Sequence, residues 1–233
     1  MKKLILFIGI VIAAAAAFVL LGERRASAPA VTQYEVTASS TPGTPGVAVK
    51  DAAWSVFESY ISALKAHDLP KVEALSYQLS ETCKDSARVK DCYEIMDNAY
   101  NFGSHFIKNN LKHVLYDDKQ IILFSEYVKH LEGESLSITR MTLYFVRDGQ
   151  DIKFLSLNPF QGALIVRTEG AATSTMSARL DEMVLDTDGD TLADDVEQCI
   201  GQIVASDCVK TDPKKMDTDN DGWWDSVDAL FYK

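Results

Sequence analysis

The stretch from Met141 to Leu157 reads MTLYFVRDGQDIKFLSL. Two runs of β-branched, aromatic and aliphatic residues flank Asp148-Gly149, a dipeptide that favours a tight turn, so we expect an antiparallel hairpin here. Two similar runs lie upstream, separated by Asp117-Asp118 and followed by Gly133. The pattern therefore predicts a meander of about four antiparallel strands. The predicted strands are His113–Tyr116, Gln120–Leu131, Ser137–Arg147 and Ile152–Leu157.

In the segment before the meander, apolar residues recur every three or four residues instead of every second residue. This spacing places them on one face of a helix. This helix runs from about Asp51 to His67. Leu69-Pro70 begins a second, short helix, because proline suits the first helical turn. A third helix covers roughly Asp91 to Lys108. Residues 50–165 therefore predict an α+β domain with three helices on one face of a curved antiparallel sheet. The apolar face of the first helix consists of Trp54, Phe57, Ile61 and Leu64.

This order of elements resembles the nuclear-transport-factor-2-like family, a cone-shaped α+β fold shared with ketosteroid isomerases. Phe57–Leu75 is similar to the first two helices of that family, and Met141–Leu157 to its closing hairpin. The resemblance implies a pocket inside the cone, and some relatives are enzymes that use a pocket Asp, His or Tyr. The corresponding candidates in this chain are His105, His113, His130, Tyr60 and Tyr127.

A catalytic role for the middle domain has little support in the sequence. The four histidines are scattered and form no cluster by spacing. No nucleophile elbow, phosphate loop or zinc signature occurs. We therefore expect a non-enzymatic binding or structural protein. The alternative is a small-molecule lyase or isomerase that acts in the cone pocket.

The N-terminus predicts a membrane anchor over residues 1–25. Lys2-Lys3 precedes an unbroken apolar run from Leu4 to Gly22, followed by Glu23-Arg24-Arg25. A helix of this length reaches about 28 Å, close to the hydrocarbon thickness of a bilayer. The positive charge before the run predicts a cytoplasmic N-terminus and a single-pass protein with its C-terminal part at the cell surface or in the periplasm. The alternative is secretion after cleavage near Ala30.

Two segments of small and polar residues predict linkers. Residues 26–49 are rich in Ala, Ser, Thr, Pro and Gly, and residues 166–185 include Thr168-Glu-Gly-Ala-Ala-Thr-Ser-Thr. Such segments bury too little apolar surface to order themselves, so we expect a flexible stalk and a second flexible connection.

The net charge of −11 is confined to one end of the chain. Residues 181–233 contain 15 acidic residues against 4 lysines, whereas residues 1–180 contain 19 of each sign. This balance favours cation binding by the acidic tail and argues against a nucleic-acid partner, because the sequence has no basic stripe for phosphates.

The four cysteines form two local pairs, Cys83/Cys92 and Cys199/Cys208. Outside the cytoplasm such pairs are expected to oxidise. We favour the two local disulfides over the two crossed arrangements and over four free thiols. A continuous helix would separate Cys83 from Cys92 by about 13.5 Å, too far for a disulfide, so the chain must turn between them.

Two twelve-residue loops in residues 186–233 predict calcium binding. The stretches Asp186–Glu197 and Asp217–Asp228 carry carboxylates at positions 1, 3, 5, 9 and 12. Calcium prefers six to eight hard oxygen ligands, and position 7 supplies a backbone carbonyl. Thr191 stands where position 6 usually has glycine, which predicts strain in the first loop. The predicted ligands are Asp186, Asp188, Asp190, Leu192, Asp194 and Glu197, and then Asp217, Asp219, Asp221, Trp223, Asp225 and Asp228.

The same tail resembles thrombospondin type 3 repeats of bacterial surface proteins. Asp186-Thr-Asp-Gly-Asp and Thr211-Asp-Pro, before the loop at Asp217, carry the resemblance. It implies an irregular calcium-binding module whose disulfide, here Cys199/Cys208, lies between the metal loops, and partners among other surface proteins or envelope components. The alternative is a dockerin-like docking module, which would lack the cysteines. We expect the tail to fold only with calcium and the middle domain to fold without it.

Overall fold

The computed structural model describes residues 32–35, 45–132, 135–157, 166–167, 185–199 and 209–231. The predicted membrane anchor, residues 1–25, lies outside these ranges. Within them, no helix combines the length and apolarity that crossing a lipid bilayer requires.

The described part of the chain is an α+β fold, as predicted, built on an antiparallel sheet. The sheet has five strands in the order β1-β2-β3-β6-β7. The Asp148-Gly149 turn joins β6 to β7, and Gly149 has the positive φ of 65° that such a turn requires. The strands are β1 (Thr32–Glu35), β2 (His113–Tyr116), β3 (Gln120–Phe124), β6 (Thr142–Asp148) and β7 (Asp151–Leu157).

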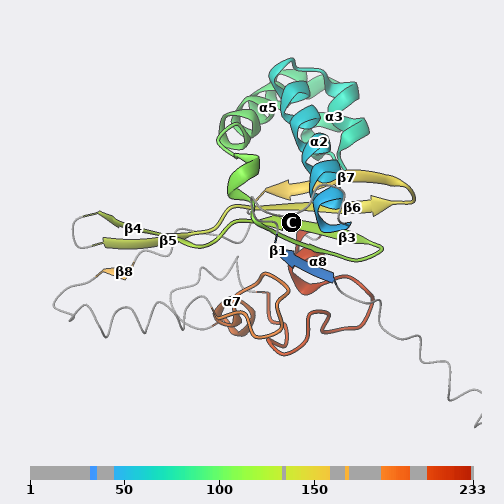
Figure 1. Cartoon of the computed structure of the whole chain (residues 1–233). Helices are drawn as coiled ribbons and strands as arrows, with labels where there is room; N and C mark the ends of the chain where they lie inside the picture. The colour runs from blue at the N-terminus through green and yellow to red at the C-terminus, as the bar shows by residue number, and fades with distance from the viewer. Residues whose placement is uncertain are drawn as a thin grey trace, which may run out of the picture. The chain divides into compact units, whose positions relative to one another are not determined.

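Two of the predicted strands, Gln120–Leu131 and Ser137–Arg147, are each interrupted. The Ser125 hydroxyl accepts a hydrogen bond from the backbone N–H of Met141, and the chain beyond this point leaves the main sheet. It forms a hairpin that extends away from the sheet (Figure 1). This hairpin belongs to a second sheet with the order β4-β5-β8. Its strands are β4 (Val128–Glu132), β5 (Ser135–Thr139) and β8 (Val166–Arg167).

Two short strands lie in segments for which composition predicts flexible linkers. Strand β1 pairs with β2, with Thr32 opposite Tyr116, and β8 pairs with β5. Backbone hydrogen bonds to strands distant in sequence order these residues, and local composition does not reveal such pairing.

The helices lie over one face of the main sheet (Figure 1). Helix α2 starts at Pro45, six residues before the predicted start. The Asp68 carboxylate caps α3 by accepting a hydrogen bond from the Lys71 N–H at 3.2 Å, with Pro70 in the first turn as expected. The third predicted helix is α5, preceded by a short additional helix. The helices are α2 (Pro45–Lys65), α3 (Leu69–Leu75), α4 (Glu81–Lys84) and α5 (Val89–Gly103), with 3₁₀ turns at Ser86–Arg88 and Lys108–Asn110.

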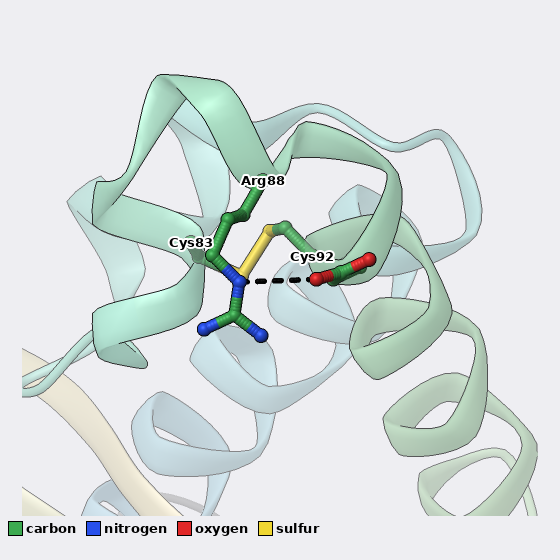
Figure 2. Close-up of a disulfide and its surroundings, with 4 residues drawn as sticks. Cys83, Arg88 and Cys92 are labelled. Carbon is green, nitrogen blue, oxygen red and sulfur yellow. Dashed lines mark hydrogen bonds and ion pairs between the residues drawn. A yellow bond between two sulfur atoms is a disulfide. The ribbon is translucent and has the colours of Figure 1, made fainter.

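A disulfide between Cys83 and Cys92 joins α4 to α5, as the sequence predicts (Figure 2). The chain turns between the two cysteines, so their Cα atoms lie 4.8 Å apart. Arg88 lies beside the disulfide and donates a hydrogen bond to Asp91 at 3.0 Å. Cys199 is also disulfide-bonded, and its expected partner, Cys208, lies outside the described residues.

Both faces of the central strands are buried. On β3, Ile121 and Leu123 face the helices, whereas Ile122 and Phe124 face the acidic tail. The tail contributes two short helices, α7 (Asp194–Gln198) and α8 (Asp225–Phe231), which begin at position 9 of the two aspartate loops. The second hydrophobic cluster therefore joins the sheet to the tail. It contains Leu115, Ile122, Phe124, Tyr144, Leu192, Trp224, Val227 and Leu230.

Candidate metal centre

Two triads of aspartates converge in the tail. In each triad the three side chains place one carboxylate oxygen each within 4.8 Å of one another. The triads could each hold a metal ion, and they are formed by positions 1, 3 and 5 of the predicted loops. The first triad is Asp186, Asp188 and Asp190; the second is Asp217, Asp219 and Asp221.

The two loops share one pattern of hydrogen bonds around position 1. Asp186 accepts a hydrogen bond from the N–H of Thr191 at 3.0 Å, and Asp217 accepts one from the N–H of Gly222 at 2.8 Å. These bonds curl the backbone around the position-1 carboxylate. The remaining oxygen lone pairs are available to a cation.

The carboxylate at position 5 also accepts the same backbone hydrogen bond in both loops. Asp190 accepts from the N–H of Leu192 at 2.7 Å, and Asp221 accepts from the N–H of Trp223 at 2.8 Å. Both loops therefore hold the third carboxylate of the triad against the residue whose carbonyl is the predicted position-7 ligand.

In each loop, the aspartate at position 9 accepts hydrogen bonds from the threonine at position 2 and so links the two ends of the loop. Asp194 accepts hydrogen bonds from the Thr187 N–H at 2.8 Å and hydroxyl at 2.6 Å. Asp225 does the same with Thr218, at 2.9 and 2.7 Å. The Thr at position 2 of both loops is therefore part of the candidate site, and the sequence analysis did not include it. The repeated Asp-Thr-Asp was the signal that could have revealed it.

Positions 4 and 6 adopt the left-handed conformation in both loops. At position 6, φ is +84° for Thr191 and +89° for Gly222; at position 4, it is +81° for Gly189 and +61° for Asn220. A β-branched residue with positive φ is strained, so the strain predicted for the first loop is confirmed at Thr191.

Position 12 of the first loop supplies a deeply buried carboxylate. Glu197 is only 1% exposed; its Oε1 accepts from the Thr211 hydroxyl at 3.0 Å, and its Oε2 has no hydrogen-bond partner among the described residues. Asp188 Oδ2 is also buried without a partner. Burying a carboxylate oxygen without a donor is costly. The two oxygens therefore fit a site for a positively charged ligand.

In the metal-free protein, burial and mutual repulsion disfavour the ionised form of the carboxyl groups in the first site. Burial, followed by the neighbouring carboxylates, raises the pKa of Glu197 to about 8 and that of Asp188 to about 6. Burial also raises the pKa of Asp190 well above its ordinary value. A divalent cation would remove these penalties.

The second site is more open to solvent. Asp219 and Asp221 are exposed, whereas Asp190 in the first site is fully buried. At position 12, burial and the charges of Asp221 and Asp219 raise the pKa of Asp228. The structure therefore places all twelve predicted residues in two loops of similar design but different accessibility.

A basic side chain from a segment next to a strand of the main sheet contacts each loop, Arg140 just before β6 and Lys119 just before β3. The Arg140 guanidinium donates to the carbonyl of Thr191 at 2.7 Å and lies 4.9 Å from the ring centroid of Phe124. The Tyr144 hydroxyl lies 3.3 Å from that of Thr191. In the second loop, Lys119 Nζ donates to the carbonyl of Asp221 at 3.0 Å. Both basic residues donate to backbone carbonyls of the loops, and the positive charge of Arg140 also opposes the burial that raises the pKa of Asp186.

The four enzyme candidates whose side chains the structure describes do not share a pocket. His105 lies against the carbonyl of Asn101, and His113 lies 2.6 Å from the Glu126 carboxylate. Tyr60 packs against Phe154, with ring centroids 4.5 Å apart. The side chain of His130 lies outside the described residues. Tyr127 lies next to Arg140, with the guanidinium 4.6 Å from its ring centroid.

Aromatic rings fill the space between the helices and the sheet. Phe57 lies 5.7 Å from Phe106 and 5.5 Å from Phe154, and Phe145 lies 5.6 Å from Phe154. An open hollow of about 340 Å³ lies between α2 and α5, and the four candidates with described side chains are not among its lining residues.

Comparisons of the chain with protein-family models, with curated proteins and with solved structures gave no match.

Proposed function

We propose that this protein is a membrane-anchored, extracytoplasmic calcium-binding protein in which the ions have a structural role. The observation that carries the proposal is the first loop, where Asp188 and Glu197 each bury a carboxylate oxygen without a donor beside the aspartate triad. A cation that accepts several hard oxygen ligands would satisfy these oxygens in their ionised form. Calcium suits them because it accepts six to eight oxygens in flexible geometry.

Several features favour calcium over magnesium and transition metals. The candidate ligands are carboxylates and carbonyls, without histidine or a free thiolate in the loops. Magnesium demands a tighter octahedron and keeps several waters. Extracellular calcium modules bind at about 0.1–1 mM, which suits permanent occupancy outside the cell.

The packing of the tail supports a structural role rather than docking to a partner. Helix α8 turns Val227 and Leu230 onto the sheet, next to Trp224. An apolar helix face that docks to a partner would have to be exposed, whereas these side chains are buried. The proposal therefore retains the likeness to thrombospondin type 3 repeats for the tail and the nuclear-transport-factor-2-like cone for the middle domain. The aromatic filling beneath the helices supports a non-enzymatic cone.

Tryptophan fluorescence tests calcium binding, because Trp223 and Trp224 lie in the second loop. We expect a saturable change when calcium is added to the full-length chain in detergent, reversal by chelator, and a much weaker response to magnesium. Asp217→Ala with Asp219→Ala should abolish the response of that loop.

A matched control removes the same charge elsewhere. Asp148 and Asp151 are exposed and lie opposite each other where β6 and β7 meet. Replacing both with alanine should leave the calcium response unchanged. Identical fluorescence, circular dichroism and protease resistance of the wild-type chain in calcium and in chelator would refute the proposal.

The proposed anchor rests on the apolar run from Leu4 to Gly22. Protease added to spheroplasts should digest the chain beyond Arg25 and spare the N-terminus. Protection of the same residues until the membrane is broken would contradict this orientation.

A further inference from the structure

A buried glutamine of the main sheet contacts the second loop. Gln120, at the start of β3, is 0% exposed, and its Oε1 accepts a hydrogen bond from the backbone N–H of Trp224 at 3.2 Å. Trp224 is itself only 3% exposed. Because a backbone N–H can only donate, the oxygen of the Gln120 side-chain amide must face it. The contact therefore ties the sheet to the second loop through a single, defined pair of atoms.

The other end of the Gln120 side chain is held by Asp117. Gln120 Nε2 donates to Asp117 Oδ2 at 3.0 Å, and Asp117 Oδ1 accepts from the backbone N–H groups of Lys119 and Gln120 at 2.8 and 2.9 Å. The turn between β2 and β3 therefore fixes the carboxylate, and the carboxylate fixes the amide with its oxygen towards Trp224. Hydrogen bonds connected in this way polarise one another.

The N–H that Gln120 binds belongs to the same peptide group as a predicted metal ligand. The carbonyl of Trp223 occupies position 7 of the second loop, and no described peptide bond is cis. In a trans peptide group the C=O and the N–H point in opposite directions, so the Trp223 carbonyl points away from Gln120. The Trp223 N–H donates to Asp221 Oδ1 at 2.8 Å, which places a carboxylate of the triad beside this residue.

We propose that Gln120 is a positioning residue of the second metal site, which fixes the Trp223–Trp224 peptide group so that the Trp223 carbonyl serves as the position-7 ligand. This inference rests on the proposed calcium binding. Partners that orient a metal ligand contribute about 10–100-fold to metal affinity. Without the Gln120 oxygen, the Trp224 N–H would be buried without an acceptor, which is costly. The peptide group would then rotate to find another partner and turn its carbonyl away from the ion.

The chain allows this single peptide group to be observed. Its three tryptophans are Trp54, Trp223 and Trp224, so only one peptide group joins two tryptophans. Tryptophan labelled with ¹³C at the carbonyl and ¹⁵N at the amide therefore gives one NMR signal that correlates the Trp223 carbonyl with the Trp224 N–H. In the wild-type full-length chain in detergent, calcium should shift the Trp223 carbonyl resonance, and the calcium-bound Trp224 N–H should resist hydrogen exchange.

Gln120→Met removes the acceptor and keeps the approximate size of the side chain. The calcium-induced shift of the Trp223 carbonyl should be lost in this variant. In the Asp186→Ala, Asp188→Ala background, where only the second loop binds, calorimetry should show a loss of calcium affinity of about tenfold or more.

The matched control is Ile122→Ala. Ile122 is buried two residues along β3 and packs against the tail, but its side chain makes no hydrogen bond. A general loosening of the core beneath the tail would affect both variants, whereas loss of positioning affects only Gln120→Met. Ile122→Ala should therefore retain the carbonyl shift, and circular dichroism checks that both variants are folded.

Exchanging the polar groups of Asp117 and Gln120 tests positioning directly. Asp117→Asn combined with Gln120→Glu swaps amide and carboxylate, so an oxygen still faces the Trp224 N–H and the net charge is unchanged. The double variant should show the wild-type carbonyl shift. The proposal is overturned by an undiminished shift in Gln120→Met, or by a wild-type Trp223 carbonyl that does not respond while calorimetry shows calcium bound to the second loop. Absence of calcium binding by the wild-type chain would instead refute the proposed function.

Discussion

Thr191 illustrates how one residue can be strained and still be suited to its position. Its φ of +84° disfavours a β-branched side chain, but its hydroxyl lies beside that of Tyr144 and its carbonyl accepts from Arg140. The sequence identified the departure from glycine. It did not reveal the compensation, because both partners lie in or just before β6, some fifty residues upstream. Gly222, at the same position of the second loop, adopts a positive φ without strain because it has no side chain. The Lys119 side chain lies next to it.

The two loop glycines with positive φ should differ in their tolerance of alanine. Both Gly189→Ala and Gly222→Ala strain the backbone by about 1–2 kcal/mol. A Cβ at Gly189 meets open space, whereas a Cβ at Gly222 collides with Lys119 Nζ, which donates to the Asp221 carbonyl. Calorimetry should therefore show a larger loss of calcium affinity for Gly222→Ala. If Lys119 is first replaced by alanine, the difference between the two glycine variants should shrink.

Glu197 predicts an unusual pH dependence of the metal-free protein. Its pKa is about 8 in the folded state against an ordinary value of 4.5, so between these values the folded chain holds a proton that the unfolded chain has lost. The free energy of unfolding should therefore fall as the pH rises from about 4.5 to 8. Calcium binds the ionised carboxylate, so its affinity should rise over the same window.

Urea unfolding in metal-free buffer at pH 5.5 and pH 8 measures this effect. Glu197→Gln removes the titrating group and should flatten the dependence. If the free energy of unfolding of that variant falls equally steeply between the two pH values, other carboxylates cause the effect.

At the scale of elements, the sequence predicted most of what depends on local spacing. His113–Tyr116 was predicted at its observed bounds, and the Asp148-Gly149 hairpin and the turn between the cysteines are confirmed. The strand interruptions were missed, because Ser125 ends the ladder by accepting a hydrogen bond from Met141, sixteen residues away. The spacing of apolar residues does not report such a contact.

The disulfide between α4 and α5 should stabilise the helices without affecting the metal loops. Replacing Cys83 and Cys92 with serine should lower the free energy of unfolding by about 2–3 kcal/mol. Urea unfolding followed by circular dichroism measures the change. Arg88→Ala removes only an exposed ion pair beside the disulfide and should cost less than about 1 kcal/mol. A changed calcium affinity in the serine variant would show that the helix layer and the loops are coupled.

At the scale of the whole molecule, the acidic tail is part of the hydrophobic core. The sequence predicted a highly charged module with little apolar surface, separate from the α+β domain. The apolar residues it has, Trp224 and Leu230 among them, cover the second face of β3 and β6. The continuous apolar run at Ile121–Phe124 was the available signal, because strands buried on both faces lack the alternation of half-exposed strands.

Calcium removal should therefore destabilise the sheet as well as the tail. At a calcium concentration 100-fold above the dissociation constant, each occupied site adds about 2.7 kcal/mol to the free energy of unfolding. Chelation should lower the melting temperature of the described α+β fold and raise the fluorescence of the apolar dye ANS, as Ile122, Phe124 and Tyr144 become accessible. The Asp217→Ala, Asp219→Ala variant should show part of this effect in calcium, and the Asp148→Ala, Asp151→Ala variant none. An unchanged melting temperature after chelation would mean that the domain folds independently of the metal.

The doubly buried strand β3 has a consequence for biosynthesis. Ribosomes complete the strands first, and the segments that cover their outer side emerge only later, with Trp224 roughly seventy residues after the sheet. At about 5–20 residues per second, the nascent sheet waits several seconds with one apolar side bare. A transcript that stops before the codon for Trp224 would leave that side bare permanently. Such a truncated product should be a substrate for chaperones and quality-control proteases, even though every helix and strand of the sheet domain has been synthesised.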